Sequence, residues 1–283
     1  THRLLTRIAT EVLFHPFQPF ILGQKQLAPK MAAKFGIPLV FYGENEAEFG
    51  NPIADNESAL RDEHFFATND FDHIYLGGVS LRQLEEDFHI DKADLAAYLP
   101  CETSDVEKNH IQVHYMGYYE RWHPQGAYYY AVEHGGFMPS PERTVGTYSK
   151  YNSIDDKIDD FFYYTTYIKY GIGRCTYDAA QEIRNHEITR EEGVALCKKF
   201  DGEFPMRFAK EVFEYLSIDK KLFGAAADCF EQPQMDLDYF MHLADRFRSP
   251  HIWQYANGKW SLRHTPFAGE SLCGFGAPGA QEA

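Results

Sequence analysis

The chain opens with apolar residues at every third or fourth position, a spacing that predicts an amphipathic helix. The residues that set this spacing are Leu4, Leu5, Ile8 and Val12. A second helix is expected from Gly23 to a cap at Gly36, because glycine readily ends a helix in the left-handed conformation. The apolar run Ile37–Tyr42 then predicts a buried parallel strand. Residues 1–43 are therefore expected to form the end of an α/β sheet unit.

The middle of the chain is polar and irregular. Residues 52–108 contain two short helical patterns, at 81–88 and 92–99, and are expected to form an insertion over the sheet. From His110 to Tyr118 polar and apolar residues alternate, which predicts a strand. His110 and His114 would share one face about 13 Å apart, which disfavours a metal site.

The C-terminal half is expected to be mostly helical. A long helix is predicted from an N-cap at Ser153 to a stop at Gly171, and Thr189 with Glu192 has the form of a capping box. Two further helices are expected to start at Ser217 and Asp236. The tail after Arg263 is rich in Gly, Ala and Ser and is expected to be poorly ordered.

Charge and composition limit the kinds of molecule that the protein is expected to bind. Lys and Arg total 27 against 42 Asp and Glu, a formal net charge of −15, which disfavours nucleic acid. An anionic substrate would need a local cluster of cations and helix N-termini. The five cysteines are scattered singly, which argues against a zinc ribbon or a disulfide framework and favours the cytoplasm. The sequence has no apolar run long enough for a membrane span.

The loop at residues 43–51 is the first candidate site, because ligands bind where strands of an open α/β sheet end. Two glycines there bracket three carboxylates, a composition suited to holding magnesium beside phosphates. An acidic surface turn is the alternative.

Two further segments are candidate anion sites. In the first, Lys150 and Lys157 flank an expected helix start, where cations and free amides could bind a pyrophosphate or a sugar diphosphate. A capped helix with solvated charges is the alternative there. The second is the turn from Lys169 to Arg174, where Arg174 could enter a cleft ahead of Asp178. A corner between helices is its alternative reading. The tyrosine-rich runs are interpreted as core.

Several stretches resemble the N-acetyl sugar amidotransferase family, over nearly all of residues 1 to about 265. The stretches that carry the resemblance are Phe17-Gln18-Pro19-Phe20, residues 41–50, Glu142-Arg143-Thr144, Gly146-Thr147-Tyr148-Ser149-Lys150-Tyr151, residues 171–174, Glu182-Ile183-Arg184, residues 188–192 and residues 200–205. The resemblance implies a member of the PP-loop ATP pyrophosphatase superfamily, in which ATP adenylates a carbonyl oxygen, pyrophosphate leaves and ammonia attacks.

That resemblance implies both an architecture and partners. The fold would be α/β, with an incomplete adenine-nucleotide alpha-hydrolase-like parallel sheet followed by a mostly helical C-terminal region. The expected domains are 1–60 for the remainder of the nucleotide-binding domain, 61–145 for an insertion or substrate region, 146–265 for the helical region and 266–283 for a disordered tail. The substrate would be a nucleotide-linked N-acetyl sugar of surface-polysaccharide synthesis, and ammonia would come from a glutaminase subunit. Homodimer formation is left open.

Site roles follow from the same resemblance. The catalytic residues would be Glu44, Glu48, Lys150 and Arg174, with Glu44 and Glu48 also holding Mg²⁺. ATP would contact Gly23, Gln24, Lys25, Gly43, Asn45, Lys169, Gly171 and Gly173. The sugar substrate would contact Tyr151, Ser153, Asp155, Asp156, Lys157 and Asp178.

The sequence departs from the family in one respect. Family members carry a Ser-Gly-Gly-x-Asp-Ser loop, preceded by paired cysteines resembling a zinc site, and neither motif occurs in these 283 residues. We expect the chain to be entered midway, with the loop and the zinc in a preceding segment, and this fragment alone to be inactive. The alternatives are a binding subunit that has lost the loop, and a different PP-loop amide ligase.

Overall fold

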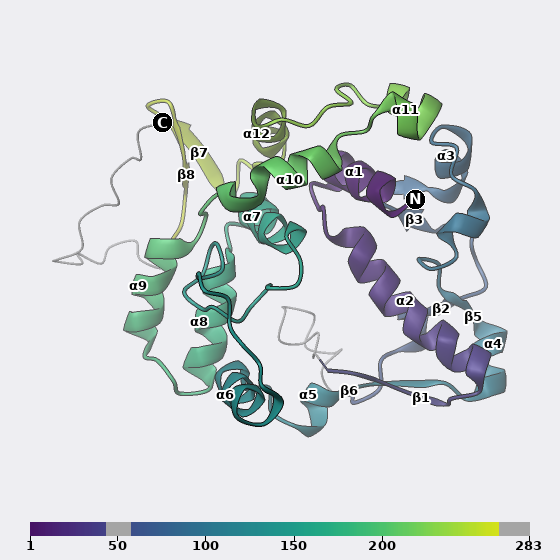
Figure 1. The fold of residues 1–283 in the computed structure, drawn as a ribbon, viewed down its shortest axis with the longest axis horizontal. Helices are drawn as coiled ribbons and strands as arrows, with labels where there is room; N and C mark the ends of the chain where they lie inside the picture. The colour runs from purple at the N-terminus through teal and green to yellow at the C-terminus, as the bar shows by residue number, and fades with distance from the viewer. Residues whose placement is uncertain (44–57, 266–283) are drawn as a thin grey trace. The chain divides into compact units, whose positions relative to one another are not determined.

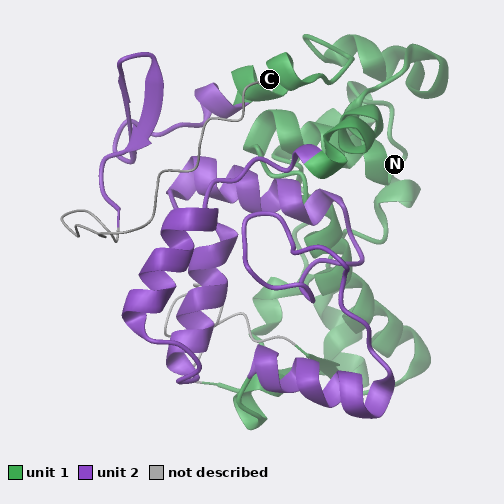
Figure 2. Ribbon diagram, turned by 60° about the vertical axis from the view of Figure 1, so that its left-hand side comes forward, with its two compact units in different colours: residues 1–122, 207–243 green, residues 123–206, 244–283 purple. Residues whose placement is uncertain are grey.

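The computed structural model describes residues 1–43 and 58–265, and the chain forms two compact units (Figure 1). Unit 1 comprises residues 1–122 and 207–243, and unit 2 comprises residues 123–206 and the segment from Ala244 onward (Figure 2). The fold is mixed α/β, as the sequence predicts. No helix in the described ranges is long and apolar enough to cross a membrane.

The two opening helices of unit 1 are confirmed, with one changed boundary. Helix α1 (His2–Leu13) buries Leu4, Leu5 and Ile8. Helix α2 (Gln18–Phe35) begins five residues before Gly23, because Pro19 in its first turn suits a helix start. It ends at Gly36 with φ 65°, the left-handed conformation expected of its cap.

The predicted strand is confirmed as parallel, but it is not buried as expected, because only Val40 of its four residues is buried. Strand β1 (Leu39–Tyr42) pairs in parallel with β6 (Gln112–Tyr115), with Val40 opposite Val113. Strand β6 is shorter than the alternation predicts, because His110 adopts φ 52° as the C-cap of the preceding helix and Met116 starts another. One face of β1 packs on α2, whereas Leu39 and Phe41 of the other face are about half exposed.

The rest of unit 1 consists of short elements. An apolar cluster, to which α1 contributes Leu4, Leu5 and Ile8, forms a core among them. Residues 92–99 form only a short 3₁₀ turn, and Ser217 ends a helix instead of starting one because its hydroxyl donates back to the Phe213 carbonyl at 2.8 Å. Asp236 caps α12 as predicted, accepting from the Tyr239 amide. The remaining elements are η3 (Glu63–Phe65), β2 (Ala67–Thr68), β3 (Tyr75–Leu76), β4 (Val79–Ser80), α3 (Leu81–Glu86), η4 (Lys92–Leu95), β5 (Cys101–Glu102), α4 (Thr103–Asn109), α5 (Met116–Tyr119), α10 (Met206–Leu216), α11 (Lys220–Phe223), η5 (Gly224–Cys229) and α12 (Leu237–Arg246), whose last three residues belong to unit 2.

Unit 2 is mostly helical, as predicted. Its helices are α6 (Pro124–Gly135), α7 (Ile158–Tyr170), α8 (Arg174–Arg184) and α9 (Arg190–Phe200). The capping box of Thr189 and Glu192 and the left-handed stop at Gly171 are both confirmed. The sequence pattern did not predict the hairpin of β7 (Trp253–Ala256) and β8 (Lys259–Leu262), which is held to α7 by a bond of 2.6 Å from Trp253 Nε1 to the Ile168 carbonyl.

The predicted N-cap at Ser153 is wrong. Helix α7 starts five residues later, at Ile158, where the Asp156 carboxylate accepts from the Ile158 amide at 2.7 Å. Ser153 has φ 49°, and its hydroxyl bonds Asp159 and Arg174 instead of capping a helix. The polar segment ahead of α7 is thereby folded back against α8.

Candidate functional site: a buried arginine centre

Arg174 is the centre of a buried polar cluster in unit 2. It is the first residue of α8, it follows the N-cap Gly173, and only 6% of it is exposed. Its Nη1 donates to Ser153 Oγ at 2.5 Å and to Asp159 Oδ2 at 3.0 Å, and its guanidinium lies 4.1 Å from the centre of the Tyr163 ring. The sequence predicts that Arg174 could enter a cleft, whereas in the structure its side chain is buried among Ser153, Asp159 and Tyr163.

The arginine is incompletely bonded. Its Nε is buried and has no hydrogen-bond partner within the described part of the chain. A buried donor of this kind normally costs about 1–3 kcal/mol, so such groups are uncommon in folded proteins. A guanidinium presents its donors as a planar fork that matches carboxylate and phosphate oxygens. The free donor makes Arg174 a candidate anion ligand.

Asp178 lies one helical turn after Arg174, on the same face of α8. Its Oδ2 accepts from Thr147 Oγ1 at 2.5 Å and from Asn152 Nδ2 at 3.1 Å. Burial raises the pKa of Asp178, and the nearby Arg174 charge counteracts part of that rise. Burial likewise raises the pKa of Asp159, against the opposing effect of its ion pair with Arg174. Two carboxyl groups whose pKa burial raises thus flank one cation.

The N-terminus of α8 is already occupied by a side chain of the same unit. Asp201 Oδ1 accepts from the Thr176 amide at 3.2 Å, and Asp201 Oδ2 accepts from the Thr176 hydroxyl. A Cβ on Gly173 would collide with the Asp201 carboxyl group, which explains the glycine at this position. The helix dipole expected to attract a substrate anion is therefore matched internally by Asp201.

A second ion pair fixes the loop before this centre. Arg143 forms a two-pronged pair with Glu203, at 2.6 Å from Nη1 and 2.5 Å from Nη2. Glu203 Oε2 also accepts from the Gly146 amide at 2.9 Å. The loop that carries Thr147 is thereby tied to the segment after α9.

An aromatic pair lies near the same loop. The rings of Tyr128 and Tyr151 stack with centroids 4.5 Å apart, and the Tyr151 hydroxyl donates to Gln125 Oε1 at 2.9 Å. Burial raises the pKa of Tyr151, so its hydroxyl stays protonated. Such a pair is a surface on which a sugar ring can pack.

The structure brings together Ser153, Arg174 and Asp178 among the residues predicted to form the site. Lys150 is exposed and donates to the Pro141 carbonyl at 3.0 Å, whereas Asp155 and Lys157 are exposed ahead of α7. Lys169 lies in the last turn of α7, and burial lowers its pKa to about 8. The functional roles assigned to these residues remain predictions.

The other predicted ATP ligands lie in unit 1 or beyond the described residues. Gly23, Gln24 and Lys25 are inside α2, where Tyr42 Oη donates to the carbonyls of the last two. Gly43 directly follows β1. The predictions for Glu44, Asn45 and Glu48, including the magnesium site, fall outside the described residues. Within residues 1–43 and 58–265, no group of three or more His, Cys, Asp or Glu side chains could hold a metal ion.

Sequence reasoning did not select four residues of the centre: Thr147, Asn152, Asp159 and Asp201. Three signals were available. Asp159 lies inside the helix predicted from Ser153 to Gly171, Thr147 lies inside a stretch that carries the resemblance, and Asp201 lies inside another. The partner of each lies far along the chain, where local sequence patterns do not point to it.

The comparisons with known proteins match the C-terminal part of the chain. Residues 145–265 match a family model described as LPS biosynthesis protein WbpG-like, C-terminal domain. The match covers less than half of the chain but includes Arg174 and every side chain that bonds it. The match supports the resemblance only as far as a family of lipopolysaccharide-biosynthesis proteins. A comparison with curated proteins finds no match.

Proposed function

We propose that the chain acts in lipopolysaccharide biosynthesis, as part of an ATP-dependent amidotransferase that works on a nucleotide-linked N-acetyl sugar. The observation that carries the proposal is the buried, unpaired Nε of Arg174, which lies inside the segment similar to the WbpG-like C-terminal domain. A diphosphate is the part of such a substrate that a guanidinium fork recognises best. The acetamido group would become an acetamidino group.

In this proposal each group of the centre has its own role in binding or proton transfer. Arg174 donates from Nε to a phosphate oxygen, while its Nη1 stays on Asp159 and keeps the fork in place. Asp178, whose raised pKa favours the protonated form, can donate that proton to a substrate oxygen. The stacked Tyr128 and Tyr151 offer a face to the sugar ring.

The nucleotide chemistry requires groups beyond these side chains. ATP, when bound, supplies the adenylyl group that activates the acetamido oxygen, and a glutaminase subunit supplies ammonia. The free donor of Arg174 fits a phosphate in charge and geometry. Magnesium ligands are not grouped among the described residues, so no role here depends on the metal.

The test is pyrophosphate release by the protein with ATP, magnesium, ammonium and a panel of UDP-N-acetyl sugars. Release that needs both ammonium and one sugar, and that falls at least tenfold in Arg174→Lys, supports the proposal. Release with an amino acid in place of the sugar would instead indicate another amide ligase.

A second candidate function is a non-catalytic subunit that binds the nucleotide sugar or the glutaminase. It is favoured by Asp201, which already matches the α8 N-terminus, and by Asp159, which already pairs with Arg174. Sugar binding without pyrophosphate release under any of these conditions would favour this candidate.

A further inference from the structure

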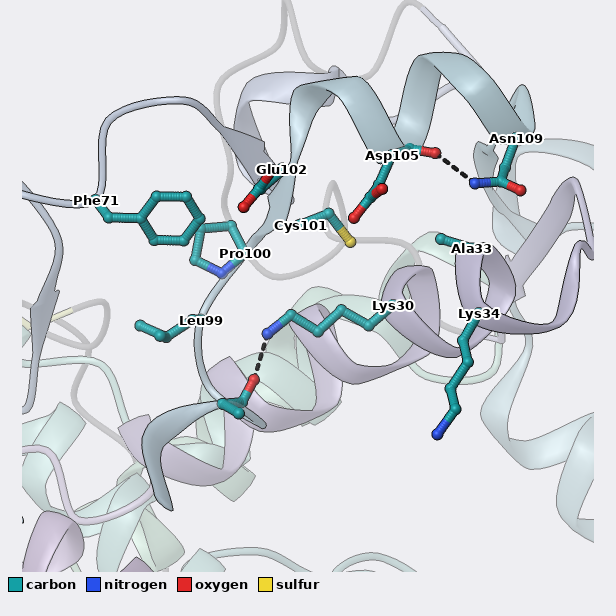
Figure 3. Close-up of a pocket in the computed structure, with 11 residues that line it drawn as sticks. Lys30, Ala33, Lys34, Phe71, Leu99, Pro100, Cys101, Glu102, Asp105 and Asn109 are labelled. Atoms are coloured by element: carbon teal, nitrogen blue, oxygen red, sulfur yellow. Dashed lines mark hydrogen bonds between the residues drawn. The ribbon is translucent and has the colours of Figure 1, made fainter. Parts of the chain in front are cut away.

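Unit 1 contains a cavity of about 380 Å³, separate from the arginine centre and not used by the proposed function. It lies between α2 and the segment that runs through β5 into α4 (Figure 3). Its size suits a small metabolite of a few heavy atoms.

The walls of the cavity differ in chemistry. Phe71, Leu99 and Pro100 form an apolar wall, and the Cys101 side chain closes the floor. Burial raises the pKa of the Cys101 thiol, so the floor is neutral. Lys30 reaches in from α2, whereas the carboxylates of Glu102 and Asp105 lie on the opposite side in Figure 3.

The charged side chains on the two sides of the cavity are not paired with each other. The Lys30 ammonium donates to the Ala96 carbonyl, which occupies one of its three donors. No ion pair of the described residues joins Lys30 to Glu102 or Asp105, and these two carboxylates accept no side-chain hydrogen bond there. A half-buried ammonium therefore faces two free carboxylates across a mostly apolar space. Burial also lowers the pKa of Lys30, which an anionic partner would reverse.

We propose that this cavity binds a small zwitterion, whose carboxylate pairs with Lys30 and whose ammonium pairs with Glu102 and Asp105. A simple anion would be repelled by the two carboxylates, and a simple cation would be repelled by Lys30. The apolar wall between the charged groups favours a ligand whose own charges are separated by a short aliphatic chain, such as an ω-amino acid.

The probes are a series of ω-amino acids from glycine to 6-aminohexanoate, titrated into the whole chain by calorimetry. Butyrate and butylammonium, which carry one charge each, are the controls. We expect one chain length to bind best and both single-charge compounds to bind at least tenfold more weakly. Equal binding of butylammonium would make the cavity a cation site, and equal binding of butyrate an anion site; either result overturns the proposal, as does no binding of any member.

Variants locate the binding. Lys30→Met should weaken the best ligand at least tenfold, and so should Glu102→Gln with Asp105→Asn. Lys108→Met is the matched control, because Lys108 is an exposed lysine of α4 that does not line the cavity; it should change affinity less than twofold. Retained affinity in Lys30→Met, with an unchanged unfolding curve, would contradict the assignment. Neither result depends on sugar binding or pyrophosphate release, so this proposal and the amidotransferase proposal fail separately.

Discussion

A buried arginine lies in each unit, Arg7 in unit 1 and Arg174 in unit 2, and the two differ in how completely their N–H groups are hydrogen-bonded. Arg7, on α1 in unit 1, is fully buried, and all five of its N–H groups donate. They bond Glu11 twice and the carbonyls of Leu216, Gln232 and Pro233 once each. Arg174 in unit 2 is nearly as buried but leaves its Nε without a partner.

The comparison separates a structural arginine from a candidate functional one. Arg7 joins α1 to the last carbonyl group of α10 and to two carbonyl groups ahead of α12, and it has no donor left for a ligand. Arg174 pairs with one carboxylate and keeps a donor free at the cost of stability. An unsatisfied buried group in a folded protein calls for an explanation, and a role in binding or catalysis is one such explanation.

We expect the largest loss in the free energy of unfolding from Arg7→Ala. It removes five hydrogen bonds, including the ion pair with Glu11 and the bond to the buried Leu216 carbonyl, so we expect a loss of about 3–5 kcal/mol in the free energy of unfolding. Urea unfolding measures the loss. Arg82→Ala is the control, because Arg82 is 81% exposed and lies 3.9 Å from Glu86. A loss in Arg7→Ala no larger than in the control would contradict the structural role.

Arg174→Ala should cost less, about 2–3 kcal/mol, because Asp159 can take up a proton once its partner is gone. Arg174→Ala with Asp159→Asn should recover part of that loss, since no unpaired carboxylate then remains. Strictly additive losses in urea unfolding would show that the two residues are not coupled.

Gly173→Ala tests the capping of α8 by Asp201. The new Cβ would displace the Asp201 carboxyl group, and losing a cap of this kind costs about 1–2 kcal/mol. Thermal unfolding measures the effect. Gly135→Ala is the control, because Gly135 is helical and a Cβ there meets no atom within 4 Å. A stable Gly173→Ala would exclude the cap.

The smallest expected effect is on how the free energy of unfolding depends on pH. Because the folded pKa of Asp178 is raised, the native state binds more protons than the unfolded chain above pH 3.8. Stability should therefore fall as pH rises from 3.8 to the raised native pKa, and stay level above it. Asp178→Asn should make that fall shallower without abolishing it, since Asp159 and Asp201 are raised as well. An identical slope in the variant would show that Asp178 does not titrate there.

The sequence predicted local features better than long-range ones. The helix stop at Gly171, the capping box at Thr189 and the strand at 39–42 depend on neighbouring residues, and all three are confirmed. The start of α7 was misplaced because Ser153 bonds Arg174, 21 residues away, and a single sequence does not show such a partner.

In the candidate site, too, local features could be predicted from the sequence and long-range contacts could not. The turn at Gly171–Arg174 could be predicted as a place for a cation, but its burial could not. Asp201 reaches α8 from 25 residues further along the chain and matches the helix end that seemed free for a substrate. Periodicity likewise does not predict the β7–β8 hairpin, whose Trp253 indole bonds the Ile168 carbonyl and packs against the Tyr167 ring of α7.

The most direct test of the central claim, that Arg174 keeps a donor for an anionic substrate, is calorimetric titration of UDP-N-acetylglucosamine into the wild type, Arg174→Lys and Arg82→Met. Lysine keeps the charge but lacks the fork, so Arg174→Lys should bind at least tenfold more weakly while Arg82→Met binds as the wild type does. Equal affinity in all three proteins, with Arg174→Lys folded, would contradict the claim and leave Arg174 as a second structural arginine.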